Sequence, residues 1–170
     1  MGESNFCGSQ TDQSNPDRAG NPANYQSHAK SMNIYFAASI SGGRQRQPVM
    51  ANIVEQLQNL GYVVLNKHIA QPDVLEYEAE YTPQQIFRRD LAWIRACQAM
   101  VAEVSTPSLG VGYEISYALQ QGKPVLCLCE ANVFLTAMLT GNDSPGLKIV
   151  RYQSHADIRA LLQQYLTQVD

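Results

Sequence analysis

The sequence predicts one α/β domain built around a parallel β-sheet. The chain has 170 residues, of which 45% are hydrophobic, so it holds enough apolar material for one buried core. Short apolar runs that favour strands alternate with segments whose apolar residues recur at helical spacing, and this alternation completes five units. Strands and helices that alternate at this length pair their strands in parallel. We therefore expect an α/β fold of the flavodoxin-like (Rossmann-type) order, with a five-stranded parallel sheet and helices on both faces.

The first predicted elements are a buried strand over 33–39, a helix over about 49–60 and a strand over 62–65. The first strand is an apolar run of β-formers. The helix is indicated by apolar residues at helical spacing, and Gly61 ends that pattern as a glycine just beyond a helix does. The stretch 66–81 that follows is polar and irregular, and connections of this length tend to carry function.

A second helix, over 83–97, opens with Thr82 as capping residue, Pro83 at the first helical position and Gln85 at the third. The later elements continue the alternation, with a Gly-Lys-Pro stop signal at 122–124. In order, we expect a strand over 99–104, a helix over 110–121, a strand over 125–129, a short helix near 133–139, a strand over 147–152 and a helix over 155–166.

The composition narrows the class of protein. Residues 1–31 are rich in Ser, Asn, Gln, Gly and Pro, which predicts a disordered tail ahead of a domain over 32–170. The net charge of −3, with 12 basic against 15 acidic residues, argues against a nucleic-acid partner. No apolar run reaches membrane-spanning length, so we expect no membrane association.

The cysteines and histidines show no metal-ligand spacing. The four cysteines, Cys7, Cys97, Cys127 and Cys129, also lack the spacing of a disulfide framework. We expect the cysteines to be buried, reduced thiols. We therefore expect a cytoplasmic or nuclear protein with no metal and no cofactor.

A candidate anion site follows the first strand. Ser39, Ser41, Gly42, Gly43 and Arg44 supply hydroxyls, accessible backbone amides and one cation near a helix N-terminus, which suits a phosphate. The carboxyl ends of the strands are also where ligands bind in such sheets. An ordinary strand-to-helix turn is the alternative interpretation of the same residues.

A candidate nucleophile follows the third strand. Glu114 falls in the predicted first turn of a helix, where free amides and the helix dipole would keep a carboxylate ionised and able to stabilise a developing cation at a sugar carbon. A stabilising surface glutamate is the alternative.

Asp90 interrupts an apolar helix face between Ile86 and Ile94. A partly desolvated carboxyl there should have a raised pKa and deliver a proton, whereas Glu114 should not, which gives the unequal pair that glycosidic cleavage uses. The alternative is an aspartate paired with an arginine at the edge of the face. Tyr35, inside the first strand, is either plain core or a hydroxyl that reaches a carboxylate.

Three ordered motifs together resemble a known family. They are Ile34-Tyr35-Phe36-Ala37-Ala38-Ser39-Ile40 with Gly42-Gly43-Arg44, then Asp90-Leu91-x-Trp93, then Val101-Ala102-Glu103-Val104 through Pro107-Ser108-Leu109-Gly110-Val111-Gly112-Tyr113-Glu114. The combination resembles the 2′-deoxynucleoside 5′-phosphate N-hydrolases, which belong with the nucleoside 2-deoxyribosyltransferases. The resemblance covers about residues 33–166, which makes the predicted domain a catalytic one.

The resemblance implies a mechanism and a substrate site. Glu114 would be the nucleophile that forms a covalent 2-deoxyribosyl 5-phosphate intermediate, Asp90 its acidic partner, and Tyr35 the residue that orients it. His68, which as an isolated loop histidine is more often structural, would line the base side. The substrate-binding set implied is Ser39, Ile40, Ser41, Gly42, Gly43, Arg44, His68, Ser108, Gly110, Gly112, Thr136 and Met138. Family members are homodimers, and Thr136 matches a hydroxyl residue that reaches the neighbouring subunit's phosphate site.

The first loop departs from the family pattern. The family usually reads Cys-Gly-Ser-Ile-Arg-Gly-Gly there, whereas this chain has Ala37, Ala38 and, in place of the arginine, Ser41. Either Arg44 compensates or phosphate preference is weaker. Thr136 stands in place of the family's usual serine and keeps the hydroxyl.

The expected activity is hydrolysis of 2′-deoxynucleoside 5′-monophosphates. The alternatives are a deoxyribosyltransferase, in which a second base resolves the intermediate, and a nucleotide-binding module without turnover.

Overall fold

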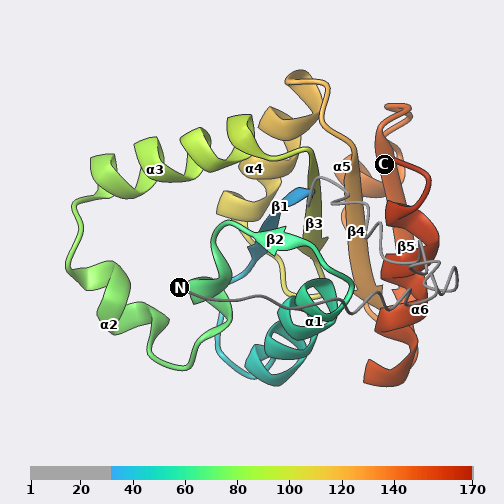
Figure 1. The fold of residues 1–170 in the computed structure, drawn as a ribbon, viewed down its shortest axis with the longest axis horizontal. Helices are drawn as coiled ribbons and strands as arrows, with labels where there is room; N and C mark the ends of the chain where they lie inside the picture. The colour runs from blue at the N-terminus through green and yellow to red at the C-terminus, as the bar shows by residue number, and fades with distance from the viewer. Residues whose placement is uncertain (1–31, 170) are drawn as a thin grey trace, which may run out of the picture.

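The structure, a computed structural model, describes residues 32–169, and the predicted disordered tail over 1–31 lies outside the described residues. Its five strands form one parallel sheet in the order β2-β1-β3-β4-β5, which confirms the predicted flavodoxin-like order (Figure 1). The strands are β1 (Asn33–Ala38), β2 (Val63–Val64), β3 (Ala99–Glu103), β4 (Val125–Glu130) and β5 (Leu147–Tyr152). The helices are α1 (Gln47–Asn59), the 3-10 helix η1 (Lys67–Ala70), α2 (Val74–Ala79), α3 (Pro83–Ala96), α4 (Leu109–Gln120), α5 (Ala137–Thr140) and α6 (His155–Leu166).

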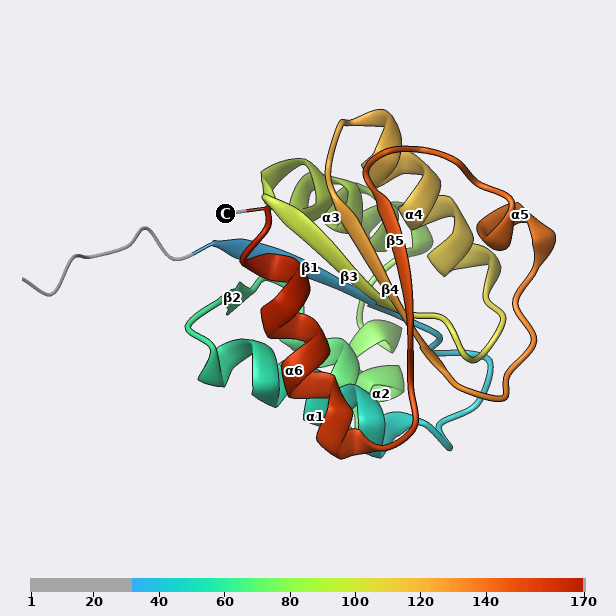
Figure 2. The same ribbon diagram turned by 90° about the vertical axis from the view of Figure 1, so that its right-hand side faces the viewer.

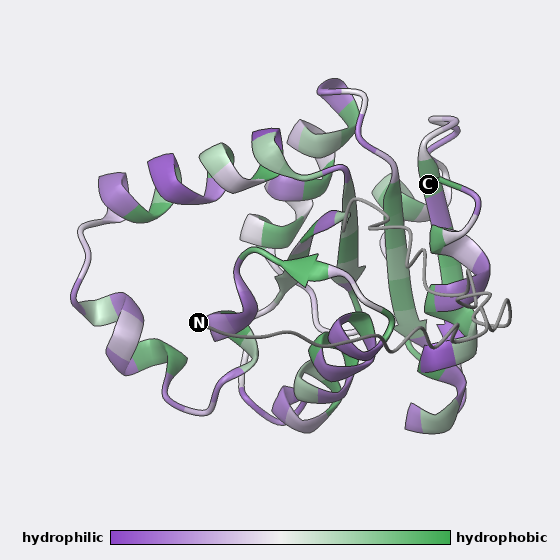
Figure 3. Cartoon of the chain, viewed as in Figure 1, coloured by the Kyte–Doolittle hydropathy of each residue, from purple (hydrophilic) through white to green (hydrophobic). Residues whose placement is uncertain are grey.

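Helices cover both faces of the sheet. Figure 2 shows α1 and α6 on one face and α3 and α4 on the other. The alternation of side chains along β1 divides the core accordingly, because Ile34 and Phe36 belong to the cluster beneath α1 and α6, whereas Tyr35 and Ala37 belong to the cluster beneath α3 and α4. Burial on both faces explains why the strands read as continuous apolar runs, and Figure 3 shows that hydrophobic character along β4.

The predicted helix boundaries depend on local capping. At the start of α3, Thr82 and Gln85 form a reciprocal capping box, and Pro83 occupies the first turn. After α1, Gly61 adopts a φ of 91°, a left-handed conformation that a glycine enters without steric cost. The predicted start signal of α3 and stop signal of α1 are therefore both confirmed.

The segment 66–81 is more ordered than the sequence predicts, because it contains η1 and α2. Asn66 begins it with a buried side chain, whose amide donates to the Phe36 carbonyl at 2.7 Å and accepts from the Phe36 N–H at 2.9 Å. Val74, fully buried, anchors α2 against the core. The apolar anchor is a single residue, which is why helical periodicity was not visible there.

The connection after β4 also differs from the prediction, since the expected short helix near 133–139 is limited to α5. Arg151 explains the difference. Its Nη1 donates to the carbonyl oxygens of Glu130, Ala131 and Val133 at 3.0, 2.9 and 2.9 Å, and the Val133 carbonyl is one that a helix beginning there would use in its own hydrogen bonds.

No helix within residues 32–169 is long and apolar enough to cross a membrane. Across the same residues, no group of three or more His, Cys, Asp or Glu side chains is arranged to hold a metal ion. Cys97, Cys127 and Cys129 are free thiols buried in the core, and Cys7 lies outside the described residues.

Candidate active site

The strand order reverses between β1 and β3, and two of the predicted loops meet at the carboxyl ends of these strands. Gly42, in the loop after β1, sits so close to the loop after β3 that an added Cβ would lie 3.0 Å from Thr106 Cγ2 and would overlap Ser39 Oγ. Gly43 adopts a φ of 109°, which also requires glycine. The two loops that follow β1 and β3 thus lie against each other at the candidate site.

A buried carboxylate fixes the loop after β3. Glu103, at the end of that strand, is fully buried, and its Oε1 accepts from the Ser105 N–H at 3.2 Å, from the Ser105 hydroxyl and from the Tyr152 hydroxyl at 3.1 Å. The Ser105 Oγ in turn accepts from the Glu130 N–H at 2.8 Å. Three neighbouring strands thus hold the start of the segment that leads to Ser108 and α4, an arrangement that the sequence did not reveal.

Tyr35 and Glu114 are joined by a hydrogen bond. The Tyr35 hydroxyl, on a side chain buried beneath α3 and α4, donates to Glu114 Oε1 at 2.7 Å. The pKa of Glu114 is raised to about 7: burial is the main cause, the hydrogen bond from Tyr35 opposes it, and the charge of Asp90 adds to it. The prediction that the Tyr35 hydroxyl reaches a carboxylate is confirmed.

The predicted environment of Glu114 is wrong in one respect. Ser108 caps α4, with its Oγ accepting from the Val111 N–H at 3.4 Å, so the helix begins at Leu109 and Glu114 lies in its second turn. The free amides of the helix N-terminus therefore do not reach the carboxylate. Burial dominates instead, and the expectation that the helix start keeps Glu114 ionised is replaced by a raised pKa.

Asp90, on α3, also has a raised pKa, because partial burial outweighs the hydrogen bond and the positive charge of Arg89. Arg89 Nε donates to Asp90 Oδ1 at 2.9 Å, so the alternative of an aspartate paired with an arginine is present as well. The predicted inequality, with Asp90 raised and Glu114 not, is wrong. Glu114 receives its hydrogen bond from a neutral hydroxyl, whereas Asp90 receives its own from a cation.

His68 lies in an aromatic cluster at the β2 side of the molecule. Its Nε2 is 3.0 Å from Glu78 Oε1 on α2, and its ring centroid lies 4.8 Å from that of Tyr77 and 5.6 Å from that of Trp93. The same Glu78 oxygen accepts from Arg89 Nη2 at 2.7 Å. A chain of contacts therefore runs from His68 to Asp90.

Sequence reasoning missed Glu78 and Arg89. The available signal was the spacing of Val74 and Glu78, four residues apart, which puts the buried valine and the carboxylate on one side of a short helix. That signal is weak when only one of the two residues is apolar.

The loop after β1 is only partly available to a ligand. The Ser39 side chain is buried, and its Oγ accepts from the Gly42 N–H at 3.2 Å, while Ile40 packs against the core and Ser41 is exposed. Arg44 donates from Nη2 to the carbonyl of Gln71 at 2.7 Å and from both Nη atoms to that of Ile69 at 3.4 Å. Its guanidinium thus ties this loop to η1 and is engaged by main-chain oxygens.

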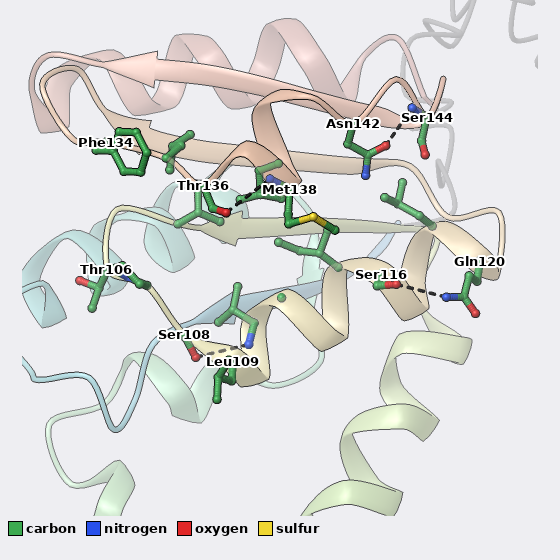
Figure 4. Close-up of a pocket in the computed structure, with 18 residues that line it drawn as sticks. Thr106, Ser108, Leu109, Ser116, Gln120, Phe134, Thr136, Met138, Asn142 and Ser144 are labelled. Carbon is green, nitrogen blue, oxygen red and sulfur yellow. Dashed lines mark hydrogen bonds between the residues drawn. The ribbon is translucent and has the colours of Figure 1, made fainter.

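A cavity of about 840 Å³ lies on another side of α4, between that helix and α5 (Figure 4). Ser108, Gly112, Thr136 and Met138 line it, whereas Tyr35, Asp90 and Glu114 do not. Thr136 caps α5 and accepts from the Met138 N–H at 3.3 Å. Within one chain, the structure thus does not bring Thr136 and Met138 to the carboxyl pair.

Large apolar side chains around this cavity are strongly exposed. Leu109 is 97% exposed, Phe134 86% and Met138 82%. In the first turns of α4, a Cβ on Gly110 would meet only Ser108 Oγ, at 3.7 Å, and one on Gly112 would meet nothing within 4 Å. Two glycines cost helix stability without any packing reason within the described part of this chain. Close approach by a ligand or a partner would supply such a reason.

The chain is similar in sequence to known proteins. The family model described as nucleoside 2-deoxyribosyltransferase matches residues 34–147. A Thermofilum pendens protein whose name assigns it provisionally as a 2′-deoxynucleoside 5′-phosphate N-hydrolase is 41% identical over 123 residues, which cover 71% of this chain and 85% of that protein. The mouse 5-hydroxymethyl-dUMP N-hydrolase is 39% identical over 137 residues, which cover 78% of each chain.

Among solved structures, the Clostridium botulinum CMP N-glycosidase superposes with a TM-score of 0.61 at 18% identity, covering 78% of this chain and 98% of that one. At this identity the likeness concerns the fold. The parallel sheet and its covering helices are shared.

Proposed function

The chain belongs to the nucleoside 2-deoxyribosyltransferase family, and from this membership we propose that it hydrolyses the N-glycosidic bond of 2′-deoxynucleoside 5′-monophosphates. The products are the free base and 2-deoxyribose 5-phosphate. The observation that carries the proposal is the hydrogen bond from Tyr35 to Glu114, with the Asp90 carboxyl close enough to influence the pKa of both groups. Enzymes that cleave glycosidic bonds commonly use two carboxyl groups in unlike surroundings, one as nucleophile and one as general acid.

In the proposed first step, a Glu114 carboxylate oxygen attacks C1′ and forms a glycosyl ester while the bond from C1′ to the base nitrogen breaks. Asp90 donates its proton to the departing base. In the second step a water oxygen attacks C1′, the ester bond to Glu114 breaks, and Asp90 takes the proton from the water. Splitting the displacement into two steps lowers each barrier, since both pass through transition states with oxocarbenium character.

The surroundings of the two carboxyls support these roles. Tyr35 donates to Oε1 of Glu114, so it stabilises the ionised form that attacks and orients the group. The pKa of Asp90 is raised by burial, which suits a group that must carry a proton to a leaving base.

We also propose that the domain works as a homodimer in which Thr136 reaches the neighbouring site. The exposed apolar side chains of Leu109, Phe134 and Met138 beside the α4–α5 cavity support an interface there. Ser39 and Ser108 are the proposed phosphate contacts within one chain, and His68 the residue on the base side. The three buried free thiols support a reducing compartment, cytoplasm or nucleus, as the place of action.

Product analysis tests the activity. The purified protein is incubated with each 2′-deoxynucleoside 5′-monophosphate, with the unphosphorylated nucleoside, and with or without an acceptor base, and the products are separated by chromatography. Free base and 2-deoxyribose 5-phosphate without exchange support the hydrolase. Base exchange would make the protein a transferase, and nucleotide binding without release of base would make it a binding module.

The nucleophile is tested with Glu114→Gln, which preserves shape and removes the attacking oxygen anion. We expect a loss of activity of at least about 1,000-fold. Glu55→Gln, an exposed change on α1, is the matched control. Mass spectrometry of wild-type protein quenched during turnover should detect the sugar phosphate on the peptide that contains Glu114, and hydrolysis that survives in Glu114→Gln would reject the assignment.

A further inference from the structure

Arg89 joins two carboxylates that lie on different helices. Its Nε donates to Asp90 Oδ1 at 2.9 Å, and its Nη2 donates to Glu78 Oε1 at 2.7 Å. These two donors form one edge of the guanidinium, so a single planar group fixes the positions of both oxygens. A partly buried side chain with two charge-assisted bonds is held far more tightly than a surface arginine.

Two aromatic rings also contact the same guanidinium. Its central carbon lies 4.9 Å from the centroid of Trp93 and 5.5 Å from that of Tyr81. Cation–π contacts of this kind favour arginine, whose flat group offers both faces to rings while its edge binds carboxylates. Lysine could keep the charge at this place but could not make both bonds and both ring contacts.

Glu78 extends the arrangement to the base side, because its Oε1 also lies 3.0 Å from His68 Nε2. The segment that carries His68 and Glu78 is thereby attached to α3 at the residue next to Asp90.

We propose that Arg89 and Glu78 form a charge pair that positions the Asp90 carboxyl and sets the pH range over which it holds its proton. The proposal rests on the proposed function in one respect, since the proton held by Asp90 is the one given to the departing base. Arg89 and Glu78 are positioning residues here, because they act through Asp90.

The position of the proton follows from the geometry. Arg89 binds Oδ1, and an oxygen that accepts from a cation is the poorer place for a proton. Oδ2 is therefore the oxygen that carries the proton. Arg89 leaves it free while preventing the carboxyl from rotating.

The charges around Asp90 determine the direction in which each substitution moves its pKa. Burial raises the pKa of Asp90, the hydrogen bond and charge of Arg89 lower it, the charge of Glu78 raises it, and His68 lowers it. From α4, Glu114 also faces Asp90, and Tyr35 on β1 lies within reach of the Asp90 charge. Removing the charge of Arg89 must raise the pKa of Asp90, and removing that of Glu78 must lower it.

Substitutions of Arg89 and of Glu78 should therefore move the pH profile of kcat/KM in opposite directions. A general acid is active while protonated, so the level of kcat/KM along the alkaline limb of its pH profile follows the protonated fraction of Asp90. Arg89→Gln should move that limb up by about one pH unit, and Glu78→Gln, which keeps an acceptor oxygen, should move it down by about half a unit. Arg89→Lys should leave the limb near its wild-type position and lower kcat by about tenfold, because the charge stays while the two-pronged bond is lost.

Arg88→Gln is the matched control, since Arg88 is the exposed neighbour on the same helix and carries the same charge. It should move neither the limb nor kcat. Shifts of the same sign in Arg89→Gln and Glu78→Gln, or no shift in either, would overturn the proposal.

A measurement without turnover separates this proposal from the proposed function. The side-chain carboxyl of Asp90 is titrated by carbon-13 NMR in the wild type and the three variants, with Asp90→Asn used to assign the signal. Opposite shifts of the Asp90 titration support the charge pair even if no nucleotide is hydrolysed. Unchanged titration in a protein that hydrolyses nucleotides would reject the charge pair and leave the activity intact.

Discussion

Tyr35 on β1 donates a 2.7 Å hydrogen bond to Glu114 on α4, and this bond is the structural link between the central strand and the proposed nucleophile. The bond stabilises the ionised carboxylate against the burial that raises its pKa.

Tyr35→Phe should therefore raise the pKa of Glu114 above its value of about 7. Since the nucleophile must be ionised, the acid limb of kcat/KM should move to higher pH by about 0.5 to 1 unit, and kcat at neutral pH should fall by about two- to sixfold. The pH profile of the purified variant measures both. Tyr165→Phe, on α6, is the control and should leave the profile unchanged. An acid limb that stays in place would show that Tyr35 does not act on the ionisation of Glu114.

Glu114→Gln should stabilise the fold, and more so at alkaline pH. An acid whose pKa is raised from 4.5 to about 7 by folding stabilises the protein fully below the lower value, and this contribution is lost as pH rises through the higher one. Glutamine carries no proton to lose and can still accept from Tyr35. We expect the gain in the free energy of unfolding, relative to wild type, to increase between pH 5 and pH 8 by up to about 3 kcal/mol. Urea denaturation at the two pH values measures it, and an equal difference at both would contradict the raised pKa.

Ser41→Arg should increase the preference for phosphorylated substrates. The exposed Ser41 lies in the loop at the carboxyl end of β1, where Arg44 is engaged by the carbonyls of Ile69 and Gln71. A cation in this loop should raise the ratio of kcat/KM for the nucleotide to that for the nucleoside by about tenfold, mainly through KM. Gln58→Arg adds the same charge on α1 as a control. An unchanged ratio would mean that the phosphate does not bind beside Ser41.

Mixed dimers test whether Thr136 acts on the neighbouring site. Thr136→Val and Glu114→Gln are each expected to lower activity in their own homodimers. In a heterodimer that pairs the two variants, one site combines a native Glu114 with a native Thr136 from the other subunit, so mixing should restore up to about half of the wild-type activity per heterodimer. Activity no greater than the mean of the two homodimers would place Thr136 outside the neighbouring site.

Met138→Asp should weaken the proposed interface, because it puts a charge among strongly exposed apolar side chains. Analytical ultracentrifugation should show a shift from dimer to monomer, whereas a wild-type protein that is already monomeric would contradict the homodimer.

The sequence predicted the sheet order because alternating apolar strands and amphipathic helices leave few arrangements. It also predicted the meeting of Tyr35 with a carboxylate, since the family motifs place both residues at the centre of the sheet. The ionisation of Glu114 was harder to foresee, because the exact helix start, set by the Ser108 cap, decides whether free amides reach the carboxyl. Glu78 and Arg89 escaped prediction because their contact joins α2 to α3 through side chains alone.

Asn66 has a consequence for association at the sheet edge. Its side-chain amide satisfies both backbone groups of Phe36, as the peptide group of one more β2 residue would do. The edge strand can therefore stop after two residues, and the turn into η1 can begin beside the proposed site. Past that point, the buried Phe36 on β1 has no open backbone donor or acceptor with which an extended peptide could pair. One side-chain amide thus closes β1, at the point where β2 ends, to the addition of another strand and to the aggregation that such addition begins.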